Sequence, residues 1–255
     1  MKRFYVIGNW KMHKTFTETL EFFELFQYSY KKYFKNNPNL APYVNNNVFA
    51  VAPAHCNLAS YFTNKVPELK LCSQNMSKNE EGAFTGEVSA RMLQDLNVTF
   101  AICGHSERRM YHSSHENDES INKKIIQCVK YNITPIICVG ESREAHSSGN
   151  TKEAIRKQLR VLLNEVNIEK VVIAYEPIWS IGSGKTPTPS EVENVCAMIH
   201  ELTSPNIPVL YGGSVNANNV NDFVNLDNVN GFLVGSASLE IDSFLKLISV
   251  NAGDK

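Results

Sequence analysis

Short apolar stretches alternate with longer amphipathic stretches along the whole chain. Eight of the apolar stretches have the length and composition of buried parallel strands, at residues 4–7, 48–52, 69–72, 98–103, 133–139, 171–175, 207–211 and 231–234. Between them apolar residues recur with helical spacing, at residues 15–35, 54–63, 88–96, 117–131, 151–166, 189–202, 217–225 and 241–249. The pattern predicts eight strand–helix units in succession.

Eight such units in 255 residues favour an α/β fold whose parallel strands close into a (β/α)8 barrel, a TIM barrel. An open doubly wound sheet usually carries fewer units or a second domain, so we expect a single barrel domain over residues 1–255. Thr188, Pro189 and Glu191 form a helix-start signal that agrees with this division. The asparagine-rich segment 36–47 is predicted to be a polar surface loop on the non-catalytic side.

Composition and charge indicate which binding partners and which cellular compartment to expect. A hydrophobic content of 43% supplies ample core, and a formal net charge of -1 gives no overall field that would attract nucleic acid or an anionic membrane. We therefore expect neither partner, and any anion must be bound locally. The six cysteines show no Cys-x-x-Cys spacing, and the apolar run at the start is too short for a signal peptide. These features predict a cytoplasmic protein.

The segment 174–187 carries the strongest chemical signal. Glu176 closes an apolar run and is followed by a rigid Pro-Ile-Trp element and then by Gly-Ser-Gly, which indicates a fixed carboxylate base beside a hinged cover. An ordinary strand-to-helix loop is the alternative. Gly184-Lys185-Thr186 raises a nucleotide-binding P-loop as a further alternative, but the glycine that this motif requires five residues earlier is Trp179.

Polar residues follow several of the predicted strands, and in a barrel of this type all strands end at one face. They are Asn9 and Lys11, Gln74 and Asn75, the run 104–109, Glu176, the turn 212–214 and the pair Gly235-Ser236. The last two are small-residue turns whose backbone N–H groups suit a phosphate dianion. No metal site is predicted, because His112-x-x-His115 lacks a third nearby ligand.

Motifs along nearly the whole chain resemble the triosephosphate isomerase family. They occur at residues 8–12, 82–87, 104–109, 138–141, 174–179, 181–182, 184–186, 211–215, 231–235 and 237–239. The resemblance implies an isomerase that interconverts dihydroxyacetone phosphate and glyceraldehyde 3-phosphate in glycolysis and gluconeogenesis, without a metal or an organic cofactor. It also implies a homodimer in which the loop from Gly82 to Glu87 enters the partner. A different phosphosugar barrel enzyme and a barrel that has lost its activity are the alternatives.

The same resemblance implies a role for each site residue. Glu176 would be the base, His105 would polarise the carbonyl and shuttle a proton, and Lys11 would stabilise the oxyanion and the phosphate. Asn9 would orient Lys11 and donate to the substrate, and Glu107 would hold the lysine or relay a proton. Phosphate binding would fall to Gly182, Ser214, Gly235 and Ser236. Ser236, His13, Ser183 and Pro187 depart from the residues usual in the family.

Overall fold

The strands of this computed structural model, which describes residues 3–63, 65–110, 116–181 and 186–250, form one closed parallel barrel in chain order. They are β1 (Phe4–Asn9), β2 (Asn47–Ala52), β3 (Leu69–Ser73), β4 (Phe100–Cys103), β5 (Thr134–Val139), β6 (Val172–Tyr175), β7 (Val209–Tyr211) and β8 (Gly231–Val234). Each pairs with its neighbours in sequence, and β1 pairs with β8, Tyr5 standing opposite Gly231. The TIM barrel expected from the sequence is confirmed.

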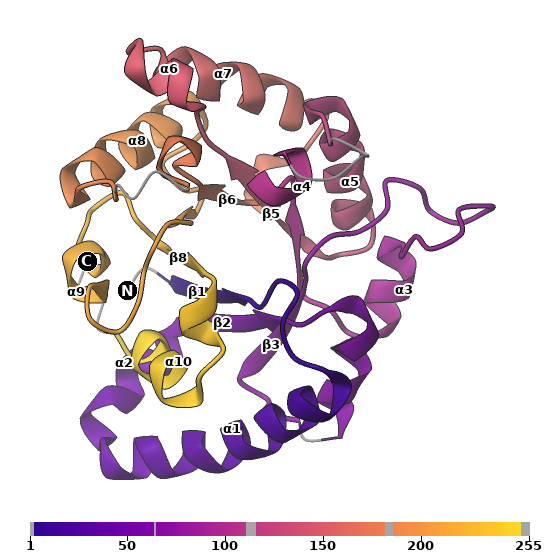
Figure 1. Cartoon of the computed structure of the whole chain (residues 1–255), viewed down its shortest axis with the longest axis vertical. Coiled ribbons are helices and arrows are strands. Elements are labelled where there is room, and N and C mark those ends of the chain that lie inside the picture. The colour runs from indigo at the N-terminus through magenta and orange to yellow at the C-terminus, as the bar shows by residue number, and fades with distance from the viewer. Residues whose placement is uncertain (1–2, 64, 111–115, 182–185, 251–255) are drawn as a thin grey trace.

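Helices surround this barrel (Figure 1). The α-helices are α1 (Phe16–Asn36), α2 (Ala41–Asn46), α3 (Ala90–Asp95), α4 (Ser106–Met110), α5 (Asp118–Lys130), α6 (Arg143–Ser147), α7 (Thr151–Leu162), α8 (Pro189–Leu202), α9 (Val220–Val224) and α10 (Ile241–Ile248). The 3-10 turns are η1 (Pro38–Leu40), η2 (His55–Phe62), η3 (Ile168–Lys170), η4 (Ile178–Ser180) and η5 (Ser236–Ser238). Among the helices, α1 and α8 begin with capping boxes, on Thr15 with Glu18 and on Thr188 with Glu191.

Most strand residues are buried on both faces of the barrel, which explains the mostly apolar sequences of the strands; Lys70 in β3 is exposed. Along β5, Ile137 and Val139 belong to the cluster that packs against the helices, whereas Ile136 and Cys138 belong to a second cluster whose buried members are all strand residues. Alternation of this kind places the second cluster inside the barrel. A filled barrel leaves no channel along its axis, so chemistry is confined to the strand ends.

Several element boundaries differ from the prediction. The segment 36–47 is not a loop: it contains η1 and α2, because Val44 is 96% buried and draws the chain into a helical turn against the core. The predicted helix at 54–63 is the 3-10 turn η2, and the predicted helix at 217–225 shortens to α9. The short helices α4 and α6 follow β4 and β5 within segments that the periodicity left unassigned.

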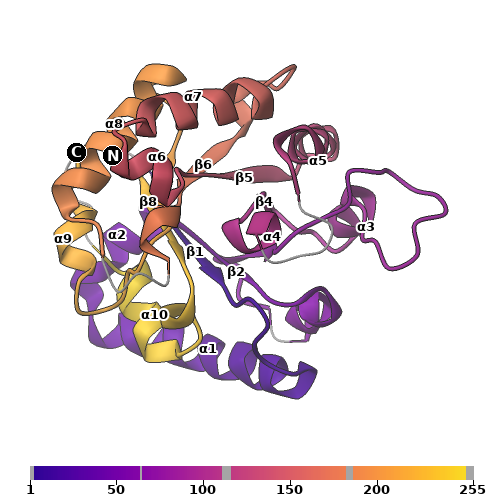
Figure 2. The ribbon, with the colours of Figure 1, turned by 45° about the horizontal axis from the view of Figure 1, so that its top comes forward.

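The loop between β3 and α3 extends away from the barrel in both views of the ribbon (Figure 2). Its residues 81–87 are all exposed, including Phe84 at 46%. The Ser77 amide donates to the Val88 carbonyl at 2.8 Å and closes the base of the loop. Gly82 and Gly86 have φ values of 132° and 91°, a region that favours glycine, so the loop's sharp turns depend on them.

Candidate active site

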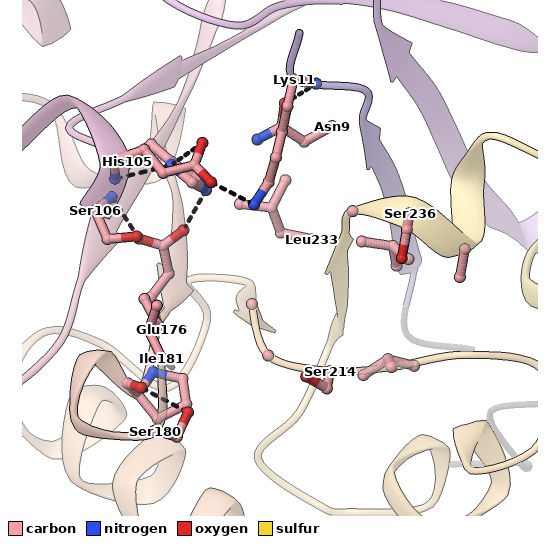
Figure 3. A pocket seen from close by; sticks show the side chains of 18 of the residues that line it. Asn9, Lys11, His105, Ser106, Glu176, Ser180, Ile181, Ser214, Leu233 and Ser236 are labelled. Carbon is pink, nitrogen blue, oxygen red and sulfur yellow. Dashed lines mark hydrogen bonds and ion pairs between the residues drawn. The ribbon is translucent and has the colours of Figure 1, made fainter. Parts of the chain in front are cut away.

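A cavity of about 410 Å³ opens at the carboxyl ends of the strands. Residues from five strand ends and their loops face it: Asn9, Lys11, His105, Glu107, Glu176, Ser214, Gly235 and Ser236. Figure 3 shows His105, Ser106 and Glu176 together on one side, and Ser214 and Ser236 on the other, with Lys11 between the two groups. All the predicted site residues that the structure describes therefore meet in one cavity. Gly182, predicted as a phosphate donor, lies outside the described residues, as do Ser183 and the His112/His115 pair.

Glu176 follows β6 directly and is 4% exposed. Its carboxylate has two donors: the Ser106 amide donates to Oε2 at 2.9 Å, and His105 Nε2 lies 3.0 Å from Oε1. The Glu176 amide donates to the Val139 carbonyl at 2.8 Å. Across from it a Cβ on Gly140 would stand 1.7 Å from the Glu176 carbonyl oxygen, so only glycine allows this approach. The base is thus fixed through both its backbone and its side chain.

His105 is oriented by the start of α4. The Glu107 amide donates to His105 Nδ1 at 3.2 Å, so Nδ1 acts as an acceptor and the ring proton lies on Nε2. That proton points at Glu176 Oε1. The arrangement gives an imidazole that can donate a hydrogen bond to an oxygen in the cavity while its other nitrogen is held by the backbone.

Lys11 has a φ of 54°, an uncommon conformation for a side chain of this size. Its amide donates to Asn9 Oδ1 at 3.1 Å, and its carbonyl accepts from Gln74 Nε2 at 2.8 Å. Its ammonium lies 2.6 Å from Glu107 Oε1. Asn9, Gln74 and Glu107 therefore hold the backbone and the charge of Lys11 in place.

The opposite side of the cavity consists of the turns after β7 and β8. A Cβ on Gly213 would stand 2.2 Å from the Tyr211 hydroxyl oxygen, and one on Gly212 would stand 3.0 Å from Glu176 Cγ, so this turn packs tightly beside the base. A Cβ on Gly235 would have only Lys11 Cε nearby, at 3.7 Å. Ser214 and Ser236 are exposed to the cavity. Exposed backbone and small side chains next to a lysine suit an anion.

Two supporting groups were missed by reasoning from the sequence. The Ser106 amide holds the base, and Gln74 bridges two strand ends by donating to the Lys11 and Ala52 carbonyls, each at 2.8 Å. Gln74 stood among the polar residues after β3, so its position was a usable signal. A backbone amide leaves no trace in residue type, and only the short helix after His105 could have indicated it.

Neither a metal-binding cluster nor a membrane-spanning helix is found in the part of the chain that the structure describes. It contains no group of three or more His, Cys, Asp or Glu side chains that could hold a metal ion. Nor does any of its helices combine the length and the apolar character needed to cross a membrane.

Comparison with known proteins agrees with this geometry. The sequence model of a family described as triosephosphate isomerase matches residues 4–251. A protein named triosephosphate isomerase from Mycoplasmopsis agalactiae is 73% identical over 252 residues, which cover 99% of this chain and 98% of the relative. Proteins of the same name from Mesomycoplasma hyorhinis and Acetivibrio thermocellus are 47% and 41% identical, over 98% and 96% of this chain and 100% and 96% of their own lengths. The chain therefore belongs to the triosephosphate isomerase family.

Proposed function

We propose that this chain, acting as one barrel domain, interconverts dihydroxyacetone phosphate and D-glyceraldehyde 3-phosphate through an enediolate. The single observation that carries the proposal is the contact of Glu176 Oε1 with His105 Nε2 at 3.0 Å in a cavity that also holds Lys11 and the two small-residue turns. A buried carboxylate, a neutral imidazole donor and an anion-binding side are the groups that proton transfer next to a carbonyl needs.

Glu176 is the base in this scheme. It removes a proton from one carbon and returns it to the next, and its low exposure keeps water from competing for the carboxylate. The substrate oxygen takes the place of Glu176 Oε1 on His105 Nε2, which frees the carboxylate to face the carbon. His105 then passes its proton between the two oxygens of the enediolate. No step requires a metal or an organic cofactor.

Lys11 supplies positive charge to the developing oxyanion and to the phosphate, and deletion of a preorganised donor of this kind costs roughly 3 to 4 kcal/mol of transition-state stabilisation. Asn9 orients the Lys11 backbone, and Glu107 holds its ammonium. The phosphate is assigned to the backbone donors of Gly182, Ser214, Gly235 and Ser236.

A coupled assay of glyceraldehyde 3-phosphate turnover by the purified chain tests the function. Metal-independent turnover is expected, and a chain that binds a phosphate-bearing inhibitor without turning over either triose phosphate would refute the proposal. A different phosphosugar specificity would show as turnover of another sugar phosphate only. Because the reaction belongs to glycolysis and gluconeogenesis, we also infer a cytoplasmic location.

We further propose a homodimer in which the loop from Gly82 to Glu87 enters the partner subunit. The loop is exposed and closed at its base, and ion pairs join the segment before it to helices α5 and α3: Glu80 with Lys130 at 2.5 Å and Glu81 with Arg91 at 2.6 Å. An exposed Phe84 at its tip favours burial against a second copy. Sedimentation should give a dimer for the parent chain and a monomer for Thr85→Arg. A fully active parental monomer would refute this assembly.

A further inference from the structure

Helix α6 covers one face of the turn η4 through a ring stack. The His146 imidazole lies on the Trp179 indole with ring centroids 4.0 Å apart and planes inclined by 10°. Trp179 is 8% exposed, whereas the His146 side chain is 36% exposed. The imidazole thus stands between the indole and solvent, and a smaller side chain at position 146 would uncover the indole face.

A buried carboxylate lies beside the stack. Glu141 is 1% exposed; its Oε1 accepts from the Tyr175 hydroxyl at 3.2 Å and lies 3.5 Å from His146 Nδ1. Burial raises the pKa of the Glu141 carboxyl, and its own backbone N–H, the Tyr175 hydroxyl, the nearby His146 and the approach of the Trp179 indole N–H offset part of that rise. The indole N–H faces the carboxylate without reaching hydrogen-bond geometry, so Trp179 Nε1 and Glu141 Oε2 are both buried without a partner among the described residues.

The residues that make these contacts flank the base Glu176 in the sequence. Tyr175 directly precedes Glu176, and Trp179 follows three residues later. Beyond the indole, Ser180 and Ile181 line the catalytic cavity. The backbone of η4 is a single turn, in which the Ser180 amide donates to Pro177 at 2.9 Å and the Ile181 amide to Ile178 at 3.1 Å. A turn this short has little rigidity of its own, so the packing of Trp179 fixes the wall that Ser180 and Ile181 form.

We propose that His146 is a positioning residue for the isomerase reaction. Its imidazole braces the Trp179 indole by stacking, and through that indole it holds the cavity wall from Pro177 to Ile181 beside Glu176. The stack covers one face of the indole in near-parallel geometry, so it is a directional contact that helps to select the indole's orientation. The inference rests on the proposed function, since its effect is measured in turnover.

The test compares His146→Ala, which removes the ring, with His146→Phe, which keeps a flat ring without nitrogens. Arg143→Gln, an exposed position on the same helix, is the matched control. For His146→Ala we expect kcat to fall about 2- to 10-fold, the range that one aromatic stack supports, while KM and the Kd of a phosphate-bearing inhibitor change less than about 2-fold. His146→Phe should restore kcat, and Arg143→Gln should match the parent.

Tryptophan emission gives a second readout that needs no substrate. The chain has two tryptophans, and Trp10 is fully buried against Phe22, so difference spectra between parent and variant report on Trp179. The emission of His146→Ala should shift to longer wavelength, and that of His146→Phe should not. Together, kcat and tryptophan emission distinguish a His146 that positions the indole for catalysis from one that only shields the indole from solvent.

The other possible results would refute either the positioning role of His146 or the proposed isomerase function. Parental kcat in His146→Ala, with or without an emission shift, overturns the positioning role. Rescue by His146→Gln but not by His146→Phe would show that polar contact with Glu141, and not stacking, is what matters, and it would overturn the brace. A parent chain without isomerase activity would refute the proposed function itself, whereas an active parent with fully active variants would refute this inference alone.

Discussion

Shortening Glu176 by one methylene group separates the position of the base from its chemistry. Glu176→Asp keeps a carboxylate but withdraws it by about one C–C bond, ~1.5 Å. With the backbone fixed by the Val139 hydrogen bond and the close approach of Gly140, the distances to the Ser106 amide and His105 Nε2 would grow from 2.9 and 3.0 Å to about 4.4 and 4.5 Å. Neither is then a hydrogen bond.

The same withdrawal moves the base away from the substrate carbon. A misplacement of about 1 Å costs on the order of 100-fold in rate, which corresponds to about 2.7 kcal/mol in the activation free energy. We therefore expect Glu176→Asp to lower kcat at least ~100-fold, while the phosphate side of the cavity keeps inhibitor affinity within a few-fold.

Glu176→Gln makes the complementary change, because it keeps the length and removes the basicity. An amide presents its oxygen to only one of the two donors, so one hydrogen bond is lost at a cost of about 1 to 3 kcal/mol in the free energy of unfolding. Turnover should fall at least as far as in the aspartate variant.

Coupled-assay kinetics, inhibitor calorimetry and thermal unfolding of the three proteins distinguish these effects. Glu201→Asp, the same change at an exposed ion pair with Lys152, is the control and should match the parent. If Glu176→Asp retained more than about a tenth of parental kcat, the fixed position of the base would be unimportant and the geometric reasoning would be wrong.

Three further changes test other parts of the site. His105→Gln should lower kcat about 100-fold or more with KM changed only a few-fold, and a change confined to KM would contradict its role as the proton donor. Gly235→Ala places a methyl group against Lys11 with nothing closer than 3.7 Å, so weaker binding of a phosphate-bearing inhibitor in calorimetry, with an unchanged melting temperature, is expected. In Glu141→Gln the burial cost of a charged carboxylate disappears while Tyr175 still has an acceptor. Because burial raises the folded-state pKa of Glu141, the parent should lose stability relative to the variant as pH rises from 4.5 through that pKa, which melting temperatures across pH would reveal.

The number and order of the strands follow from local pattern, because a strand buried on both faces must be apolar throughout. Boundaries were less predictable where tertiary contacts decide them. The prediction began the fourth strand at residue 98, but β4 and its paired register with β5 start at Phe100. The burial of Val44 turned an apparent loop into a helix, an effect that asparagine and proline content could not indicate.

The polar residues of the site were identified from the sequence, and so were the contacts of Lys11 with Asn9 and Glu107, but the contacts of Glu176 were not. Family motifs and strand-end positions pointed to Glu176, His105 and Lys11. They did not indicate that Glu176 would rest on His105 and the Ser106 amide, or that His146 would lie on Trp179. Such contacts depend on loop conformation and on the register of neighbouring strands, which residue types alone do not determine.

The polar groups of the site are paired with one another, and this pairing determines what a substrate must supply. Glu176 is bonded to His105, and Lys11 is paired with Glu107. A carbonyl oxygen that accepts from His105 releases Glu176 for proton transfer, and a phosphate beside Gly235 gives Lys11 a second anion. A neutral sugar can replace Glu176 on His105 but brings no anion to Lys11. Inorganic phosphate can bind beside Lys11 but brings no carbonyl oxygen to His105. Only a short molecule that carries both a carbonyl and a phosphate makes both contacts at once. Selection between substrates therefore depends on the two contacts together and not on either contact alone.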